Sequence, residues 1–412
     1  MGEGYVCIAA DTNRATSMDR TTLLLSAARF SSAIARLCLG PLMPLLSVSL
    51  NLSNDEKRAL LSAYSSGYIL TQIGGGLLAD RYGASTVIAS AVGISSLILL
   101  YITSATSAVV WANAFFCLGL VAGPLFPAGS TAISTHVPFE RRASAAAIVD
   151  AAAAAGTTVA ALAPMIADRF GWKLVYYVTS IALAVVSVGA LSLSSKRKQK
   201  LPGSNTTAEK YPIASLLSPA ALSTYLCHSA DNFTKYSVNA WAATMLSEKH
   251  GASPSMIGLI LGTQEAVGVV SRLLVGMAFS SGASSSFARR GVTSALAFLV
   301  QGVALLAAFR ASTPTMTAIM FVVSAIAVGA HSVGFRPIYF EASPEHAGSV
   351  SGLGNTVASL ASAVGPVVVG SISGWNRVGL VMILVNFVGA MAAMAISRAG
   401  KSKRVMNDKT YQ

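Results

Sequence analysis

Long apolar runs recur from one end of the chain to the other, and each is about as long as a membrane is thick. A hydrocarbon layer of about 30 Å is crossed by a helix of about 20 apolar residues. We identify twelve such runs in the 412 residues, and short polar links separate them. The chain is 53% hydrophobic and only 11% charged. These features predict an all-α membrane protein with twelve transmembrane helices.

The runs fall into two groups of six. The first group covers residues 25–49, 59–79, 84–104, 108–134, 143–167 and 173–194, and the second covers 218–246, 254–281, 289–309, 314–340, 348–372 and 377–397. Between the groups lies SSKRKQKLPGSNTTAEKYP, a polar stretch rich in bases and turn formers. We therefore expect four parts: a six-helix half at 1–194, a linker at 195–217, a second six-helix half at 218–397 and a tail at 398–412.

The distribution of basic residues predicts the orientation of the chain. The net charge is +13, but the 29 Lys and Arg residues are spread over many short loops and both termini. They form no continuous stripe of the kind that binds nucleic acid. If the N-terminus is cytoplasmic, more than half of the bases lie in cytoplasmic segments, as the positive-inside rule requires. We expect a multi-pass protein of a plasma or organelle membrane, with both termini, the linker and the tail in the cytoplasm.

The sequence shows no pattern typical of an enzyme. There is no phosphate-binding glycine loop that leads into a Lys. No candidate nucleophile has a basic residue at a spacing that is typical of a catalytic motif. The four cysteines are scattered without metal or disulfide spacing. We therefore predict no enzymatic activity, no cofactor and no metal site.

The two halves resemble each other in sequence. The segment VPFERRASAAAIVDAAAAAG resembles SPEHAGSVSGLGNTVASLASA when the chain is shifted by about 205 residues, half its length. The shift aligns Glu140 with Glu345, Asp150 with Asn355, and the GW pair at 171–172 with that at 374–375 to within two residues. Parallel repeats of this kind are a known transporter plan, with the substrate bound at the seam between halves that alternate in access. We therefore expect two pseudo-symmetric halves and translocation.

Charged residues inside the runs are the candidates for that substrate site. A charge at the bilayer centre costs about 2.5–3.5 kcal/mol, so such residues are functional candidates by default. The cations are Arg29, Arg36, Lys235, Arg272 and Arg336, and the acids are Asp150, Asp231 and Glu265. The excess of cations favours an anionic substrate.

Arg36 lies well inside the first run and is the strongest candidate anion ligand. Its guanidinium offers forked donors for a carboxylate or a phosphate. Arg29 lies two turns earlier on nearly the same face and could equally extend to the membrane interface. In the second run, Tyr64 and Tyr68 follow one stripe, where they could hydrogen-bond the substrate or only pack.

The seventh run carries a polar face. In HSADNFTKY, His228, Asn232, Lys235 and Tyr236 fall at positions i, i+4, i+7 and i+8, which lie together on a helix. Asp231 and Lys235 are also four apart, so a mutually neutralising pair is the most economical interpretation of these two.

The remaining acids have two open interpretations each. Asp150 lies in an alanine-rich helix, where it could be a proton site or a protonated group that locks the helix by hydrogen bonding. Glu265 lies seven residues before Arg272, so an internal ion pair competes with a role in ion coupling.

The charged stretch GGGLLADRYG ends the second run and begins the cytoplasmic turn after it. Its glycines allow another helix to approach closely, and Asp80 can lie against a helix N-terminus. Gly76, Asp80, Arg81 and Gly83 form the pattern G-x-x-x-D-R-x-G, which resembles the signature loop of the major facilitator superfamily. The resemblance implies the major facilitator fold and a latch that closes the cytoplasmic side. The family usually continues with two bases, where this chain has Ala84 and Ser85.

Four further segments narrow the resemblance. They are SSGYILTQIGGGLLADRYG, LGLVAGPLFPAGSTAISTHVPFERRAS, HSADNFTKYSVNAW and GFRPIYFEASPEHAGSVSGLGNT. Together they are similar to the anion:cation symporter branch, which includes type I sodium-phosphate, vesicular glutamate, sialic-acid and plant organellar phosphate carriers. That resemblance implies coupling to H⁺ or Na⁺. The chain departs from the branch in the fourth run, where Phe115 and Ala122 replace a usual Arg and Glu.

We therefore expect a monomeric secondary active transporter of a small organic or inorganic anion in the lipid bilayer. A facilitator-type exporter of uncharged or cationic compounds and a non-transporting nutrient sensor remain alternatives. The candidate residues are Arg36, Tyr68, His228, Asn232, Tyr236, Arg336 and Asn355 for substrate binding, Asp150 and Glu265 for ion coupling, and Gly76, Asp80, Arg81, Gly83, Glu140 and Arg141 for gating.

Overall fold

The computed structural model describes residues 20–72, 74–138, 141–194, 213–280, 287–341 and 347–410. Within these ranges every regular element is a helix, which confirms the predicted all-α class. Most of the predicted linker, residues 195–212, lies outside the described residues.

The helices of the first half extend to residue 194. They are α2 (Arg20–Leu37), α3 (Leu39–Ser49), α4 (Asn54–Gln72), α5 (Gly74–Tyr82), α6 (Ala84–Ile102), α7 (Ala108–Ala122), α8 (Leu125–His136), α9 (Arg142–Phe170) and α10 (Trp172–Ser194).

The helices of the second half begin after the linker. They are α11 (Ile213–Leu216), α12 (Pro219–His250), α13 (Pro254–Ser280), α14 (Phe287–Arg310), α15 (Pro314–Phe335), α16 (Ile338–Glu341), α17 (Ala347–Gly370) and α18 (Trp375–Thr410).

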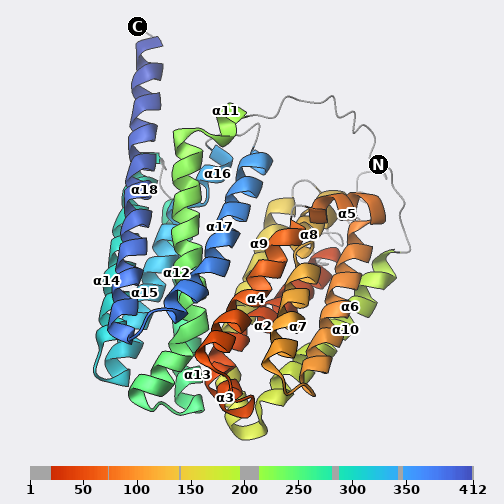
Figure 1. Ribbon diagram of the computed structural model, residues 1–412. Helices are drawn as coiled ribbons and strands as arrows, with labels where there is room; N and C mark the ends of the chain where they lie inside the picture. Colours follow the sequence, from red (N-terminus) through yellow and green to blue (C-terminus); the bar gives the residue numbers. More distant parts are fainter. Residues whose placement is uncertain are drawn as a thin grey trace, which may run out of the picture.

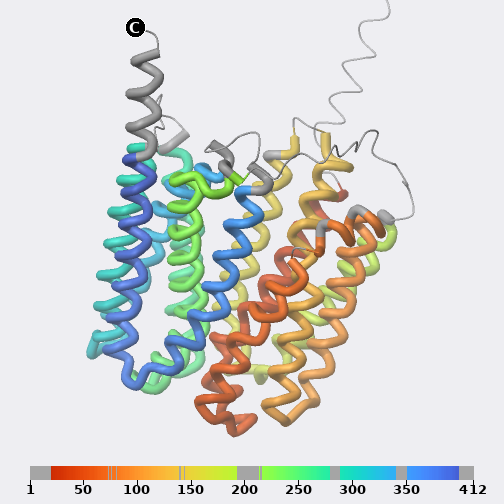
Figure 2. Tube along the Cα trace, turned by 45° about the horizontal axis from the view of Figure 1, so that its top comes forward, coloured from red at the N-terminus to blue at the C-terminus, as the bar shows by residue number. Residues whose placement is uncertain are grey.

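The two halves form two bundles that stand side by side (Figures 1 and 2). The first bundle has one apolar core, which includes Leu42, Met43 and Trp111, all fully buried. The second bundle buries its own clusters around Phe309 and Phe298. The bundles lie closest at the end opposite the C-terminal end of α18 (Figure 1).

Most of the predicted spans are long and apolar enough to cross a membrane. In the described residues nine helical segments pass this test, and a tenth span is formed by α2 and α3, which meet at a bend of 41°. The predicted runs at 59–79 and 218–246 correspond to α4 with α5 and to α12, which carry more polar side chains. The full count of twelve therefore remains a prediction.

The internal repeat appears at equivalent places in the two halves. Gly171 has φ = 79° and Gly374 has φ = 87°, a region that favours glycine. Each glycine directly precedes the tryptophan that begins the last helix of its half, Trp172 in α10 and Trp375 in α18. The sequence repeat is therefore also a structural one.

The bend between α2 and α3 follows from a proline. Pro41 has no N–H, so the carbonyl of Leu37 loses its partner in the helix. The side-chain Nδ2 of Asn239, on α12 of the other half, donates to this carbonyl at 3.4 Å. Gly40 packs directly against the backbone of Asn239 at the same point. The break in the first span is thus a contact between the halves.

A set of contacts joins the halves at the end opposite the termini. The guanidinium of Arg58, near the start of α4, donates to Gly370 O and to Ser371 Oγ, both at 3.3 Å. Asp55, one turn earlier, forms an ion pair with Arg58. We call Arg58, Gly370 and Ser371 the outer clamp. Two further contacts lie at the same end: Lys57 with Glu248 at 3.8 Å and Ser255 Oγ with Asp168 at 2.5 Å.

Helices α4 and α7 pack almost backbone to backbone. A Cβ atom at Gly119 would lie 2.8 Å from the backbone nitrogen of Tyr68, and one at Gly67 would lie 3.0 Å from that of Leu120. Small residues allow such close packing between membrane helices. This contact holds α4, and with it Tyr64 and Tyr68, against the first bundle.

Replacing Gly119 by Ala should therefore destabilise the protein by about 1–3 kcal/mol, because α4 must shift to make room. Gly276→Ala on α13 is the matched control, since no heavy atom lies within 4 Å of its added Cβ. We expect that control to unfold at the same or a higher temperature than the wild type in detergent. Equal melting temperatures for the two variants would contradict the close packing.

Candidate functional site

Arg36 lies in the last turn of α2, directly before the bend. Its guanidinium carbon is 4.2 Å from the ring centroid of Tyr236, 4.9 Å from that of Tyr64 and 5.5 Å from that of Tyr68. Tyr64 and Tyr68 come from α4, and Tyr236 comes from α12. Aromatic rings of both halves therefore surround one cation, an arrangement that we call the tyrosine cage.

Arg36 has no acidic partner in this cage. Its Nη2 donates weakly to Ser65 Oγ at 3.5 Å. The ion pairs among the described residues join Lys57 to Glu248, Arg58 to Asp55, and Asp231 to His331 and Arg336, and none of them includes Arg36. Ring faces attract a cation but leave the donors at the guanidinium edge available. The cage can therefore present Arg36 to an anion.

Other cations lie near the cage. The ammonium of Lys235 is 5.8 Å from the ring of Tyr236, and Arg29 and Arg336 are close enough to act on Tyr236 electrostatically. The guanidinium of Arg29 lies 5.8 Å from the ring of Phe126, so Arg29 also has a packing contact. The seam at Tyr236 is thus positively charged from both sides.

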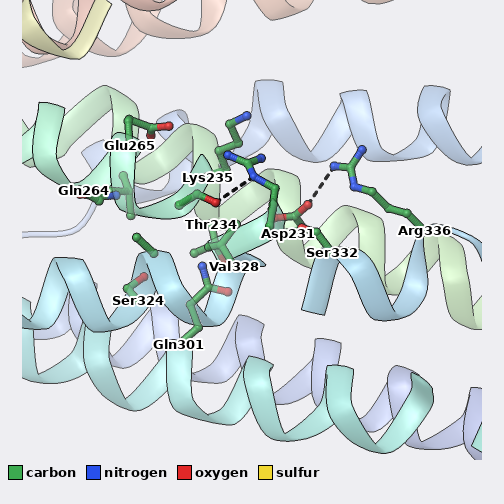
Figure 3. A pocket seen from close by; sticks show the side chains of 14 residues that line it. Asp231, Thr234, Lys235, Gln264, Glu265, Gln301, Ser324, Val328, Ser332 and Arg336 are labelled. Carbon is green, nitrogen blue, oxygen red and sulfur yellow. Dashed lines mark hydrogen bonds and ion pairs between the residues drawn. The ribbon is translucent and has the colours of Figure 1, made fainter. Parts of the chain in front are cut away.

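A polar pocket lies inside the second half, between α12, α13, α14 and α15 (Figure 3). Its empty volume is about 550 Å³, part of it open to solvent. The charged residues of its lining are Asp231, Lys235, Glu265, Arg272 and Arg336. The pocket and the tyrosine cage share helix α12, because Asp231 and Lys235 lie on the same helix as Tyr236.

The partner of Asp231 differs from the sequence prediction. Asp231 Oδ2 accepts from Arg336 Nη2 at 3.1 Å (Figure 3). Asp231 Oδ1 lies 4.0 Å from His331 Nε2. The predicted pair of Asp231 with Lys235 is therefore wrong. The packing of α15 against α12 brings Arg336, 105 residues further along the chain, closer than the neighbour one turn away.

Three residues of the predicted polar face of α12, His228, Asn232 and Tyr236, contact three different partners. His228 is buried and shares a 3.0 Å hydrogen bond with the hydroxyl of Tyr339. Asn232 Nδ2 donates to Ala358 O on α17 at 3.0 Å. Tyr236 covers Arg36. The structure thus places Tyr236 at the seam and His228 inside the second half.

One further candidate, Asn355, lies near a contact between the halves. Asn355 is half-buried on α17, and its carbonyl accepts from Ser359 Oγ at 2.7 Å. Ser359 Oγ also lies 3.4 Å from Gln72 Oε1 on α4 of the first half. Asn355 therefore lies one turn from this contact.

The two candidate coupling acids lie in different places. Asp150 is exposed on α9 and does not line the polar pocket. Glu265 does line it, together with Arg272, whose Nε donates to Gly268 O at 3.1 Å. The ion pairs of the described residues do not include the predicted pair of Glu265 with Arg272.

The gating candidates are described only in part. Arg81 is exposed in the last turn of α5, Gly83 begins the turn into α6 with φ = 86°, and Arg141 caps α9. The surroundings of Gly76, the side chain of Asp80 and the whole of Glu140 lie outside what the structure describes.

Phe115 and Ala122 belong to the core of the first half. Phe115 is fully buried and stacks on Trp111 with a 6.1 Å separation of ring centroids, and Ala122 is also buried. Apolar packing therefore fills the positions where the resembling branch carries an Arg and a Glu.

The sequence prediction missed two residues that hydrogen-bond polar side chains inside the second half. His331 on α15 is fully buried, stacks on Phe298 at 4.1 Å between ring centroids, and shares a 2.9 Å hydrogen bond with Gln301. Tyr339 of α16 bonds His228. The signal was present in AHSVGFRPIY, where His331 interrupts an apolar run five residues before Arg336.

Known proteins agree with this architecture. A family model described as the Major Facilitator Superfamily matches residues 25–276 and 222–409. The probable galactarate/D-glucarate transporter GudP of Bacillus subtilis is 24% identical over 398 residues, covering 86% of this chain and 85% of the relative. The probable chloroplastic anion transporter 4 of rice (Oryza sativa) is 25% identical over 369 residues, covering 82% of this chain but only 62% of the relative.

Solved structures share the fold. A bacterial homolog of the human lysosomal transporter Spinster, in an inward-facing and unoccupied conformation, superposes with a TM-score of 0.78 at 18% identity. The match covers 93% of this chain and 97% of the solved one.

The tyrosine cage predicts a measurable coupling between Arg36 and Tyr64. Tyr64→Leu should lose about 0.5–2 kcal/mol of stability through the lost cation–π contact, whereas Tyr64→Phe keeps the ring and should lose little. In an Arg36→Met background the difference between Leu and Phe at position 64 should shrink, as a double-mutant cycle of thermal unfolding would show. An unchanged difference would mean that the ring only fills space.

Proposed function

The chain belongs to the Major Facilitator Superfamily, and on that premise we propose that it is a secondary active transporter of a small organic or inorganic anion. The observation that carries the proposal is the tyrosine cage, where Arg36 has aromatic and hydroxyl neighbours but no acidic one among the described residues. A buried guanidinium without a carboxylate is costly unless a ligand supplies the negative charge. The chain is thus a transporter rather than an enzyme.

The chemistry of the relatives supports an anionic substrate. GudP is named for galactarate and D-glucarate, and the rice relative is named as an anion transporter. Forked donors on Arg36 suit a carboxylate or a phosphate. Lys235 and Arg336 add positive charge from the second half near Tyr236.

The position of the site supports transport by alternating access. Arg36 belongs to the first half, and Tyr236 and Lys235 belong to the second. An anion bound between them would contact both halves and could favour their closure around it. The outer clamp joins the halves at the end opposite the termini, and the superposed Spinster homolog is named as inward-facing. We take the present arrangement to be open toward a cytoplasmic side that holds both termini.

Flux measurements separate the alternatives. Purified protein in liposomes is offered galactarate, phosphate, glutamate and sialate under imposed gradients of H⁺ and Na⁺. Movement of uncharged or cationic compounds alone would support an exporter of such compounds. Binding of an anion without flux would support a sensor.

The sharpest test concerns Arg36. Arg36→Lys keeps the charge but loses the planar fork, so binding of a carboxylate or phosphate should weaken clearly, by about tenfold or more. Arg36→Ala should nearly abolish binding. Arg310→Ala, at the exposed end of α14, is the control that should bind as the wild type does. Affinity is measured per folded molecule, and wild-type affinity in Arg36→Ala would remove the main reason for an anionic substrate.

The outer clamp predicts a second, independent effect. Arg58→Ala removes two hydrogen bonds between the halves, each worth about 0.5–1.5 kcal/mol, so states opened at this end should become more populated. Distances between spin labels at Ser104 and Ser312, exposed at this end of the two halves, should shift to longer values.

Arg377→Ala is the matched control for the clamp. Among the contacts of the described residues, the side chain of Arg377 bonds only Ser373 of its own half, at 3.4 Å. Its distance distribution should match that of the wild type. A clamp variant with the wild-type distribution would show that Arg58 does not hold the halves together.

A further inference from the structure

One carboxylate oxygen in the polar pocket lacks a hydrogen-bond partner among the described residues. Asp231 is 2% exposed, and its Oδ2 accepts from Arg336, but Oδ1 has no partner. The nearest donor, His331 Nε2, is 4.0 Å from Oδ1 and bonds Gln301 Oε1 at 2.9 Å instead. Buried acceptors are rarely left unpaired, and such an exception calls for an explanation.

The groups around Asp231 are mostly basic. His228 and Lys235 face it from its own helix α12, and His331 and Arg336 face it from α15 and its end. Tyr339 of α16 and Cys227 of α12 are the other titratable neighbours. Across the pocket, α13 contributes Glu265 and Arg272, and α14 contributes the neutral Gln301. Asp231 is the acid that directly opposes the cation Arg336.

We propose that Asp231 is the acceptor of a coupling proton, and that its protonation transfers Arg336 from Asp231 to the transported anion. This inference rests on the proposed function. A proton needs only the single oxygen Oδ1, whereas hard metal cations such as Ca²⁺ and Mg²⁺ are held by six or more oxygens. The cations Lys235, Arg272 and Arg336 in the same lining also disfavour a metal ion.

The proton step changes the charge of the pocket by one unit. A proton from water forms an O–H bond at Oδ1, the carboxylate becomes a neutral acid, and the ion pair with Arg336 loses its charge attraction. Arg336 can then turn toward an anion, because its side chain is 50% exposed. Arg336 already lies within electrostatic range of Tyr236, the ring that covers Arg36.

This arrangement makes the proton and the anion bind together. An anion that arrives alone competes with Asp231 for Arg336. A proton that arrives alone leaves Arg336 without a counter-charge. Each ligand therefore raises the affinity for the other, which is the reciprocal coupling that a symporter requires.

The test uses liposomes that contain the full-length protein and a trapped pH-sensitive dye. The probes are galactarate, phosphate and glutamate, with an acidic exterior. The wild type should accumulate a transported monoanion by about tenfold per pH unit of gradient and acidify the lumen. Asp231→Asn mimics the protonated form, so it should still exchange internal for external anion, at a rate that no longer depends on pH, but should neither accumulate it nor move protons.

A matched control separates this effect from the loss of an acid elsewhere in the chain. Glu56→Gln changes an acid of α4 to its amide, away from the pocket, and the amide oxygen can still accept from Ser53. It should keep proton-driven accumulation. If Asp231→Asn does not yield folded protein, the uptake of about one proton when the wild type binds the probe in weakly buffered detergent provides the same test.

Several results would overturn the inference. Proton-driven accumulation that persists in Asp231→Asn would do so, as would loss of coupling in Glu265→Gln with retained coupling in Asp231→Asn. Accumulation driven by Na⁺ at equal pH, or anion binding without proton uptake, would equally exclude Asp231 as the proton acceptor. A wild type that moves none of the probes would instead contradict the proposed function itself.

Discussion

The absence of water around a membrane span is the constraint on which this structure depends. Every backbone group in the hydrocarbon layer must find a partner inside the protein, and every charge must find a neighbour that tolerates it. Pro41 frees the carbonyl of Leu37, and Asn239 from the other half takes it. Immediately before this point lies Arg36 in its cage of rings. The bend and the cation thus occur together, at the place where the halves meet.

Helix α12 connects the two charged regions. Asp231 and Tyr236 are five residues apart, so they differ in height by about 7.5 Å along the helix axis. Asp231 faces the polar pocket, while Tyr236 faces the first half. A small rotation or shift of α12 would therefore change the surroundings of both residues at once. Helix α12 is not among the nine segments of the described residues that are long and apolar enough to cross a membrane. These contacts explain why it carries more polar residues.

The sequence was sufficient for the fold class and for one central residue. Apolar runs of membrane length and a repeat at half the chain length led to two helical halves, and Arg36 stood out because a cation in such a run is rare. The partner of Asp231 could not be predicted, because spacing along one helix favours Lys235 while the packing of α15 decides for Arg336. For the same reason the helical spacing grouped His228 with Tyr236, although Tyr339 of α16 holds His228 inside the second half. Contacts between distant helices are set by packing, which periodicity does not reveal.

The outer clamp has a consequence for the conditions in which the protein can work. Arg58 donates to a backbone carbonyl and a serine hydroxyl, and neither acceptor gains or loses a proton in ordinary solutions. Arginine stays charged up to about pH 12. These two hydrogen bonds therefore persist in a neutral or a moderately acidic medium. A compartment that becomes acid on that side would change the supply of protons without removing either of these two acceptors of Arg58.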